Sequence, residues 1–174
     1  MVDHLSVCVL GLGYIGLPTA SLLATKGFNV TGVDVRQDVV KTINGGKIHI
    51  VEPELDILVK SAVQSGHLVA SLEPETADIF ILAVPTPFKN DYEPDLSYVE
   101  QATKNIAPFL REGNIVILES TSPVGTTELV SEWIRDTRGD EIKLYIAHCP
   151  ERVLPGHILR ELIENDRVVG GITP

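Results

Sequence analysis

Three glycines near the N-terminus have the spacing of a dinucleotide-binding turn. Gly11, Gly13 and Gly16 lie in the stretch GLGYIG, directly after the apolar run LSVCVL. In such a motif the first glycine permits a tight turn and the second lets the backbone approach a pyrophosphate. The third lets the following helix pack closely against the sheet. Because backbone N–H groups at a helix start bind phosphate without a basic side chain, we predict a pyrophosphate site here.

An acidic residue ends the next apolar run. Asp34 closes the stretch NVTGVD, at about the ~20-residue distance expected for a carboxylate that binds the ribose hydroxyls of NAD. The same carboxylate would repel the 2′-phosphate of NADP. Arg36 keeps NADP open as an alternative, since arginine can bind that phosphate. The three glycines could also form an ordinary turn between a strand and a helix, but the position of Asp34 at the end of the next apolar run favours a site for NAD.

Two loops rich in hydroxyl groups follow later apolar runs. VPTPF carries Thr86 between two prolines, and ESTSPVGTTE carries a cluster of serines and threonines at the start of an expected helix. We expect Thr86, Thr121 and Thr127 to contact the cofactor. For Ser122 and Thr126, helix capping and cofactor contact are equally open.

A further polar pair follows the last expected strand. CPERVLPG places Glu151 and Arg152 at the same sheet edge, and their spacing does not exclude a surface ion pair. The two cysteines, Cys8 and Cys149, lie far apart, and the histidines lack metal-binding spacing. We therefore predict no metal site, and Cys8 is expected to be a small buried core residue.

The elements that must position these residues alternate between strand and helix. The expected strands are residues 5–11, 29–35, 68–71, 77–84, 114–120 and 143–149. The expected helices are residues 14–26, 36–44, a segment ending near 65, 95–110 with Asp95 as N-cap, and 125–137. Such alternation favours βαβ units, and right-handed crossovers then favour a Rossmann-type, doubly wound α/β fold. We expect residues 1–174 to form one such domain, with a mostly parallel sheet and helices on both faces.

Composition narrows the possible partners. The net charge is −10, which argues against non-specific binding to nucleic acid. No apolar run approaches the ~20 residues needed to span a bilayer, so we expect no membrane association. The N-terminus lacks the features of a signal peptide, and a cytoplasmic location is expected.

Seven motifs together resemble the UDP-glucose/GDP-mannose dehydrogenase family over nearly the whole chain: GLGYIGLP, VDV, HIVEPEL, AVPTPFK, ESTSPVGTTE, CPERVLPG and NDRVVGG. The resemblance implies that a UDP-sugar C6 alcohol is oxidised to a carboxylate while two NAD are reduced. A cysteine thiolate captures the intermediate aldehyde. Glu119 stands where UDP-glucose members usually carry lysine. Together with PERVLPG and VPTPFK, it favours the N-acetylmannosamine branch of the family.

The resemblance also implies roles for individual residues. Contacts to NAD are implied for Tyr14, Ile15, Asp34, Thr86 and Thr127. Thr121 would lie near the reacting centre and help to orient water. Glu151 would exchange protons or position water during thioester hydrolysis. Arg152 and Val153 would contact the nucleotide sugar.

Two catalytic residues that the resemblance implies have no counterpart in this sequence. The nucleophilic cysteine and an oxyanion-stabilising lysine belong to a central helix and a second domain, and Cys149 does not match that cysteine. We therefore expect the NAD-binding portion of a homo-oligomeric enzyme, inactive by itself. The alternatives are another UDP-sugar 6-dehydrogenase of the same family, or a naturally short NAD-binding module without catalysis.

Overall fold

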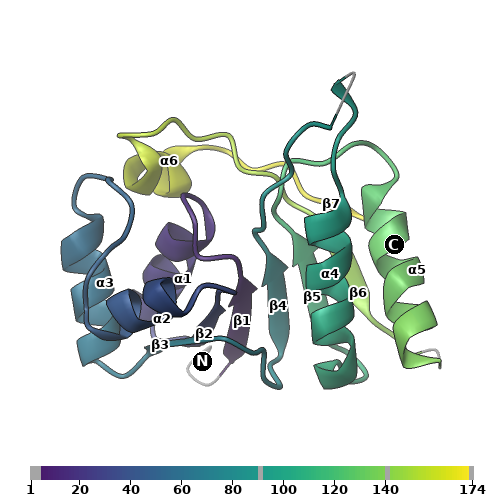
Figure 1. Ribbon diagram of the computed structural model, residues 1–174, viewed down its shortest axis with the longest axis horizontal. Coiled ribbons are helices and arrows are strands. Elements are labelled where there is room, and N and C mark those ends of the chain that lie inside the picture. Colours follow the sequence, from purple (N-terminus) through teal and green to yellow (C-terminus); the bar gives the residue numbers. More distant parts are fainter. Residues whose placement is uncertain (1–4, 90–91, 140–141, 173–174) are drawn as a thin grey trace.

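The computed structural model describes residues 5–89, 92–139 and 142–172. Within them, one seven-stranded sheet has the order β3-β2-β1-β4-β5-β6-β7. The strands are β1 Ser6–Leu10, β2 Asn29–Val33, β3 Leu68–Ser71, β4 Ile79–Leu82, β5 Ile115–Leu118, β6 Tyr145–His148 and β7 Gly170–Gly171. The first six are parallel, and β7 pairs antiparallel with β6 (Figure 1). The predicted Rossmann-type α/β fold is confirmed.

Helices cover both faces of this sheet. They are α1 Gly16–Thr25, α2 Gln37–Asn44, α3 Leu55–Gln64, α4 Ser97–Ile106, α5 Thr126–Arg138 and α6 Ile158–Glu164. Apolar side chains of α1, α2 and α3 form one core cluster, and those of α4 and α5 form another. In Figure 1, α1 to α3 and α6 gather at one end of the sheet, while α4 and α5 lie at the other.

Strand β1 shows why its sequence is continuously apolar. Val7 and Val9 join the cluster of α1 to α3, whereas Cys8 and Leu10 join the cluster of α4 and α5. All four side chains are buried. A strand covered by helices on both faces needs apolar residues at every position rather than at alternate ones. The predicted burial of Cys8 is confirmed, and burial raises the pKa of its thiol to about 12.

Three details differ from the sequence-based expectations. Asp95 is not the N-cap of α4: that position is Leu96, and Asp95 instead accepts the N–H of Ser97 at 3.0 Å just before the helix. The helix expected over 95–110 ends at Ile106 and continues as a 3₁₀ turn, because Pro108 cannot donate a helical hydrogen bond. Helix α6 was not predicted. In the part of the chain that the structure describes, no helix is long and apolar enough to cross a membrane.

The fold brings the predicted loops to one edge. Strands β1, β4, β5 and β6 run parallel, so the segments that follow them all emerge at the same side of the sheet. Strands β2 and β3 are added on one side of β1, whereas β4, β5 and β6 are added on its other side, so the strand order reverses between the parallel neighbours β1 and β4. Open α/β sheets bind their ligands at such a switch point.

Candidate cofactor and substrate site

Two of the three glycines are required by the packing of the chain itself. Gly11 has φ +92°, and a Cβ added to it would lie 2.5 Å from the carbonyl oxygen of Ala83. A Cβ on Gly16 would lie 1.8 Å from the carbonyl oxygen of Gly11. Both glycines thus allow β1, β4 and the start of α1 to approach closely.

Gly13 has a different role, because a Cβ added there would meet nothing within 4 Å. Its backbone therefore faces open space at the start of α1. That helix has no acidic residue in its first turn and no side chain capping its N-terminus. Free N–H groups and the positive end of the helix dipole favour an anion at this position. The residues present thus fit the pyrophosphate of a dinucleotide.

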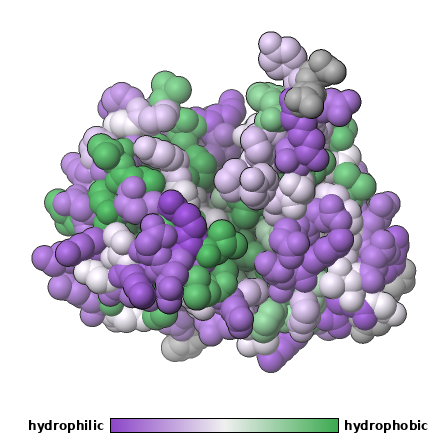
Figure 2. Space-filling model, in the orientation of Figure 1, coloured by the Kyte–Doolittle hydropathy of each residue, from purple (hydrophilic) through white to green (hydrophobic). Residues whose placement is uncertain are grey.

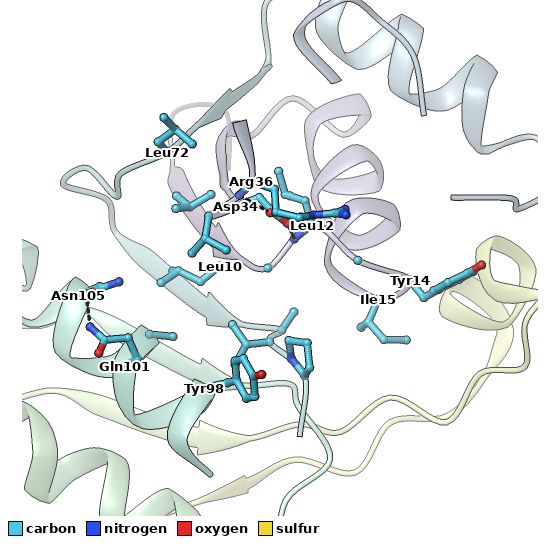
Figure 3. A pocket seen from close by; sticks show the side chains of 18 of the residues that line it. Leu10, Leu12, Tyr14, Ile15, Asp34, Arg36, Leu72, Tyr98, Gln101 and Asn105 are labelled. Atoms are coloured by element: carbon cyan, nitrogen blue, oxygen red, sulfur yellow. Dashed lines mark hydrogen bonds and ion pairs between the residues drawn. The ribbon is translucent and has the colours of Figure 1, made fainter. Parts of the chain in front are cut away.

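A cavity of about 520 Å³ opens beside the glycine turn. Figure 3 shows its labelled side chains, with Tyr14 and Ile15 near one end, Asp34 and Arg36 behind the turn, and Gln101 and Asn105 across from them on α4. Most of the remaining lining is apolar: Leu10, Leu12, Val33, Val35, Leu72, Ala83, Val84 and Pro85. Hydrophobic surface is visible between α2 and α4 in Figure 2. An apolar cavity with a few polar groups suits a planar base and its ribose.

Asp34 is fixed within this cavity by the backbone. Its Oδ2 accepts the N–H of Leu12 at 3.2 Å, and its Oδ1 accepts the N–H of Arg36 at 3.0 Å. The guanidinium Nε of Arg36 lies 3.9 Å from the same Oδ1, and 57% of the Arg36 side chain is exposed. The carboxylate thus ties the glycine turn to the end of β2, and the charge of Arg36 is partly neutralised.

His49 also lines the cavity, although sequence analysis did not single it out. Its Nδ1 is buried and has no hydrogen-bond partner within the described residues. Burial and the nearby charge of Arg36 lower the pKa of His49, so the imidazole is neutral at physiological pH. It lies in the quoted motif HIVEPEL, where a single histidine without a partner residue gave no signal.

The loops after β4 and β5 are joined by a hydrogen bond. Thr86 Oγ1 donates to the carbonyl oxygen of Thr121 at 2.8 Å. Ser122 Oγ donates to the Ser120 carbonyl at 3.0 Å, and Thr126 Oγ1 donates to the Pro123 carbonyl at 2.8 Å. Neither hydroxyl accepts a helix N–H in these bonds, so side-chain capping of α5 is not what Ser122 and Thr126 provide.

Glu151 and Arg152 do not form the surface ion pair that their spacing left open, because each has another partner. Glu151 forms an ion pair with Arg167, which precedes β7. Arg152 is exposed and donates from Nη2 to the carbonyl oxygen of Asp166 at 2.9 Å. Glu151 also lies beside Glu119, a buried carboxyl group whose Oε1 accepts the hydroxyl of Thr19.

Glu52 is a further buried carboxylate that sequence analysis did not assign. Its Oε2 accepts the N–H of Gly156 at 2.8 Å, and its Oε1 accepts the N–H of Ile158 at 2.7 Å. It therefore fixes the loop between β6 and α6 from a segment more than one hundred residues earlier. The side chain is 5% exposed.

The predicted residues thus fall into two groups. Those that line the cavity are Gly11, Gly13, Tyr14, Ile15, Asp34 and Arg36. Gly16 is buried and is not part of the lining. Thr86, Thr121, Thr127, Glu151, Arg152 and Val153 belong to the loops and first helical turn after β4, β5 and β6, outside that lining. Across residues 5–89, 92–139 and 142–172, no cluster of potential metal ligands is found.

The doubly wound sheet, the glycine turn and the carboxylate behind it define a Rossmann dinucleotide-binding domain. The sequence profile described as "UDP-glucose/GDP-mannose dehydrogenase family, NAD binding domain" matches residues 5–174. The chain belongs to this family, and its cofactor is NAD.

Individual relatives agree with this assignment. The chain is 58% identical to the UDP-N-acetyl-D-mannosamine dehydrogenase of Campylobacter jejuni, over 96% of this chain and 44% of that protein. It is 56% identical to the NDP-N-acetyl-D-galactosaminuronic acid dehydrogenase of Ralstonia nicotianae, over 99% of this chain and 43% of that protein. The solved UDP-D-ManNAc dehydrogenase of Pyrococcus horikoshii superposes with a TM-score of 0.91 at 43% identity, covering 96% of this chain and 41% of that one. The chain therefore spans less than half the length of these relatives.

Proposed function

We propose that residues 1–174 are the NAD-binding domain of an enzyme that oxidises the C6 alcohol of UDP-N-acetylmannosamine to a carboxylate. The observation that carries this proposal is the cavity at the β1–β4 switch point, with Glu151, Thr86 and Thr121 on the same sheet edge. The Campylobacter and Pyrococcus relatives support the choice of sugar. An enzyme of this kind meets NAD and UDP-sugars in the cytoplasm, where we place it.

The chain's residues would bind and orient the cofactor, which accepts hydride from C6 when bound. The open space at Gly13 and the start of α1 would hold the pyrophosphate. Asp34 would accept hydrogen bonds from the adenosine ribose. Tyr14 and Ile15, which line the cavity on the turn into α1, would contact the cofactor beside the pyrophosphate. Thr86, Thr121 and Thr127 would contact the nicotinamide half. Arg152 and Val153 would contact the nucleotide sugar.

Glu151 would move protons in the second half of the reaction. In the proposed reaction, the first oxidation of the C6 alcohol would remove a hydride and a proton and leave an aldehyde. A cysteine thiolate adds to that aldehyde, a second hydride leaves to give a thioester, and water then releases the carboxylate. Burial raises the pKa of Glu151 above that of an exposed glutamate, so its carboxylate is the stronger base toward the water that attacks the thioester. Cys8 and Cys149 are both buried in the structure, and we assign the nucleophile to the remainder of the protein.

The test uses the complete gene product with NAD and a panel of UDP-sugars. We expect turnover with UDP-N-acetylmannosamine. Glu151→Gln should accumulate a covalent sugar-nucleotide adduct, detected by mass spectrometry, and slow the overall rate ~10²–10⁴-fold. Glu164→Gln, an exposed carboxylate on α6, is the matched control. A Glu151→Gln enzyme with the wild-type rate and no adduct would contradict the assigned role.

A second candidate substrate has its own support. The relative from Ralstonia is 56% identical and is named for N-acetylgalactosaminuronic acid. The same panel distinguishes the two sugars, since they differ in stereochemistry but not in C6 chemistry. Residues 1–174 alone should bind NAD and produce no NADH with either sugar. Sedimentation of the complete gene product tests the expected homo-oligomer.

A further inference from the structure

Glu119 is a buried carboxyl group directly after β5. Its side chain is 3% exposed. Oε1 accepts the hydroxyl of Thr19 on α1 at 3.2 Å, and it lies 3.7 Å from Nη1 of Arg167. Oε2 is also buried, and no donor is hydrogen-bonded to it within the described residues. An ionised carboxylate with such an unpaired oxygen would be costly in this position.

The carboxyl group of Glu151 lies within hydrogen-bonding reach of Glu119. The guanidinium of Arg167 forms an ion pair with both carboxyl groups. It is in direct contact with Glu151, whereas its Nη1 lies 3.7 Å from Oε1 of Glu119. The cluster thus holds two carboxyl groups and one guanidinium. Two neighbouring carboxylates cannot both ionise cheaply, and one proton between them removes both the excess charge and the unpaired oxygen.

We propose that Glu119 is a positioning residue for Glu151: Glu119 holds the single proton that the two carboxyl groups share and donates it in a hydrogen bond to the Glu151 carboxylate. This inference rests on the proposed function for the role of Glu151. Glu119 cannot itself reach substrate from beneath the loop, because it is enclosed by Thr19, Arg167 and Glu151. It acts by fixing the orientation of Glu151 and by reducing its affinity for a second proton.

The surroundings favour the proton on Glu119 rather than on Glu151. Burial, followed by the charge of Glu151, raises the pKa of Glu119 to about 7. Arg167 stabilises the ionised form of Glu151 by direct contact. Among the described residues, the other groups beside this cluster are the Thr19 hydroxyl, which donates to Glu119, and the Cys149 thiol, 3.9 Å from Nη1 of Arg167.

The first test is a carboxyl titration of residues 1–174 by ¹³C NMR with labelled glutamate. Glu119→Gln and Glu151→Gln assign the two signals, and Glu132→Gln, exposed on α5, is the control. We expect one proton to stay on the pair until pH 6 or above, and this upper step to be absent in Glu119→Gln. Titration of both groups as independent carboxyls below pH 5 would overturn the inference.

The second test is the pH profile of thioester hydrolysis in the complete gene product. Glu119→Gln, which keeps a hydrogen-bond donor but cannot ionise, should retain the rate within about threefold and lose the inflection near neutral pH. Glu119→Leu, which removes the donor, should slow hydrolysis at least tenfold with unchanged NAD affinity. An unaltered profile in Glu119→Gln would overturn the inference. The NMR titration needs no turnover, so it tests the shared proton independently of the proposed function. If the proton is shared but the complete enzyme is inactive on every UDP-sugar, the proposed function and the positioning role are refuted while the pairing of the two carboxyl groups stands.

Discussion

The carboxylate of Asp34 accepts the backbone N–H of Leu12 at 3.2 Å. The residue that would select the cofactor's ribose is therefore the same one that holds the glycine turn in place. Cofactor binding and cofactor discrimination would be coupled here, because a ligand that displaces Asp34 would also disturb the turn proposed to bind the pyrophosphate.

The first prediction concerns cofactor preference. Asp34→Asn keeps the size of the side chain but loses its charge and one acceptor. We expect NAD affinity to fall by roughly tenfold, about 1.4 kcal/mol, and the preference over NADP to narrow. Calorimetric titration with both cofactors measures this, and Asp38→Asn, exposed in the first turn of α2, is the control. An unchanged ratio of affinities would show that Asp34 does not discriminate.

The second prediction separates the glycines by role. Gly13→Ala places a methyl group in open space, so the free energy of unfolding should stay within about 1 kcal/mol of wild type. NAD affinity should nevertheless fall at least tenfold, because the methyl group occupies the pyrophosphate's approach. Gly16→Ala collides with the Gly11 carbonyl and should destabilise the fold itself.

Urea unfolding and calorimetry together distinguish these two variants. If Gly13→Ala binds NAD with wild-type affinity, then the pyrophosphate does not lie against this residue, and the placement proposed for the cofactor is wrong.

The third prediction concerns the buried carboxylate of Glu52. Glu52→Ala leaves the N–H groups of Gly156 and Ile158 without an acceptor. Loss of charged hydrogen bonds and burial of unpaired donors should lower the free energy of unfolding by about 2–4 kcal/mol. Hydrogen exchange should accelerate at residues 156–158 first. Glu54→Ala, an exposed neighbour, is the control, and equal effects of both substitutions would contradict the anchoring role.

The fourth prediction is a pH dependence of stability. The pKa of Glu119 is raised from 4.5 to about 7, so the folded state binds a proton that the unfolded state releases. The protonated Glu119 therefore stabilises the folded state fully below about pH 4.5, and this stabilisation is lost as pH rises through about 7. Glu119→Gln should therefore remove a decline in stability between pH 5 and 8 that is on the order of 2 kcal/mol.

The comparison must be made as a difference between wild type and variant. His49 has a lowered pKa, so its contribution has the opposite sign in this window and cancels in the difference. Asp78 and Asp95 have lowered pKa values and act only at more acidic pH. Parallel stability curves for wild type and Glu119→Gln would show that Glu119 is ionised throughout.

Sequence could predict the parts of this molecule that depend on local pattern. The strand LSVCVL, the glycine turn and Asp34 are close in sequence, and each requires a particular residue type at a particular spacing. The fold class follows from the same patterns, since buried parallel strands are apolar throughout.

Contacts between distant segments left no such signal. The position of Glu151 directly after an expected strand marks it as a candidate site residue. Its contacts with Arg167 and Glu119 could not be predicted, because those residues lie on other segments of the chain. Sequence spacing alone could not exclude pairing with the adjacent Arg152. Helix α6 was missed because its seven residues are too few to establish a period.

The anchoring of Glu52 also has a consequence for how the protein is made. A ribosome releases Glu52 long before it releases Gly156 and Ile158, which lie 104 and 106 residues later. Until then the segment between α2 and α3 carries a carboxyl group whose two hydrogen-bond donors have not yet been synthesised. Helix α6, which packs against α1, is likewise among the last segments to emerge. The half that carries the glycine turn therefore reaches its final form only after nearly the whole domain has been synthesised.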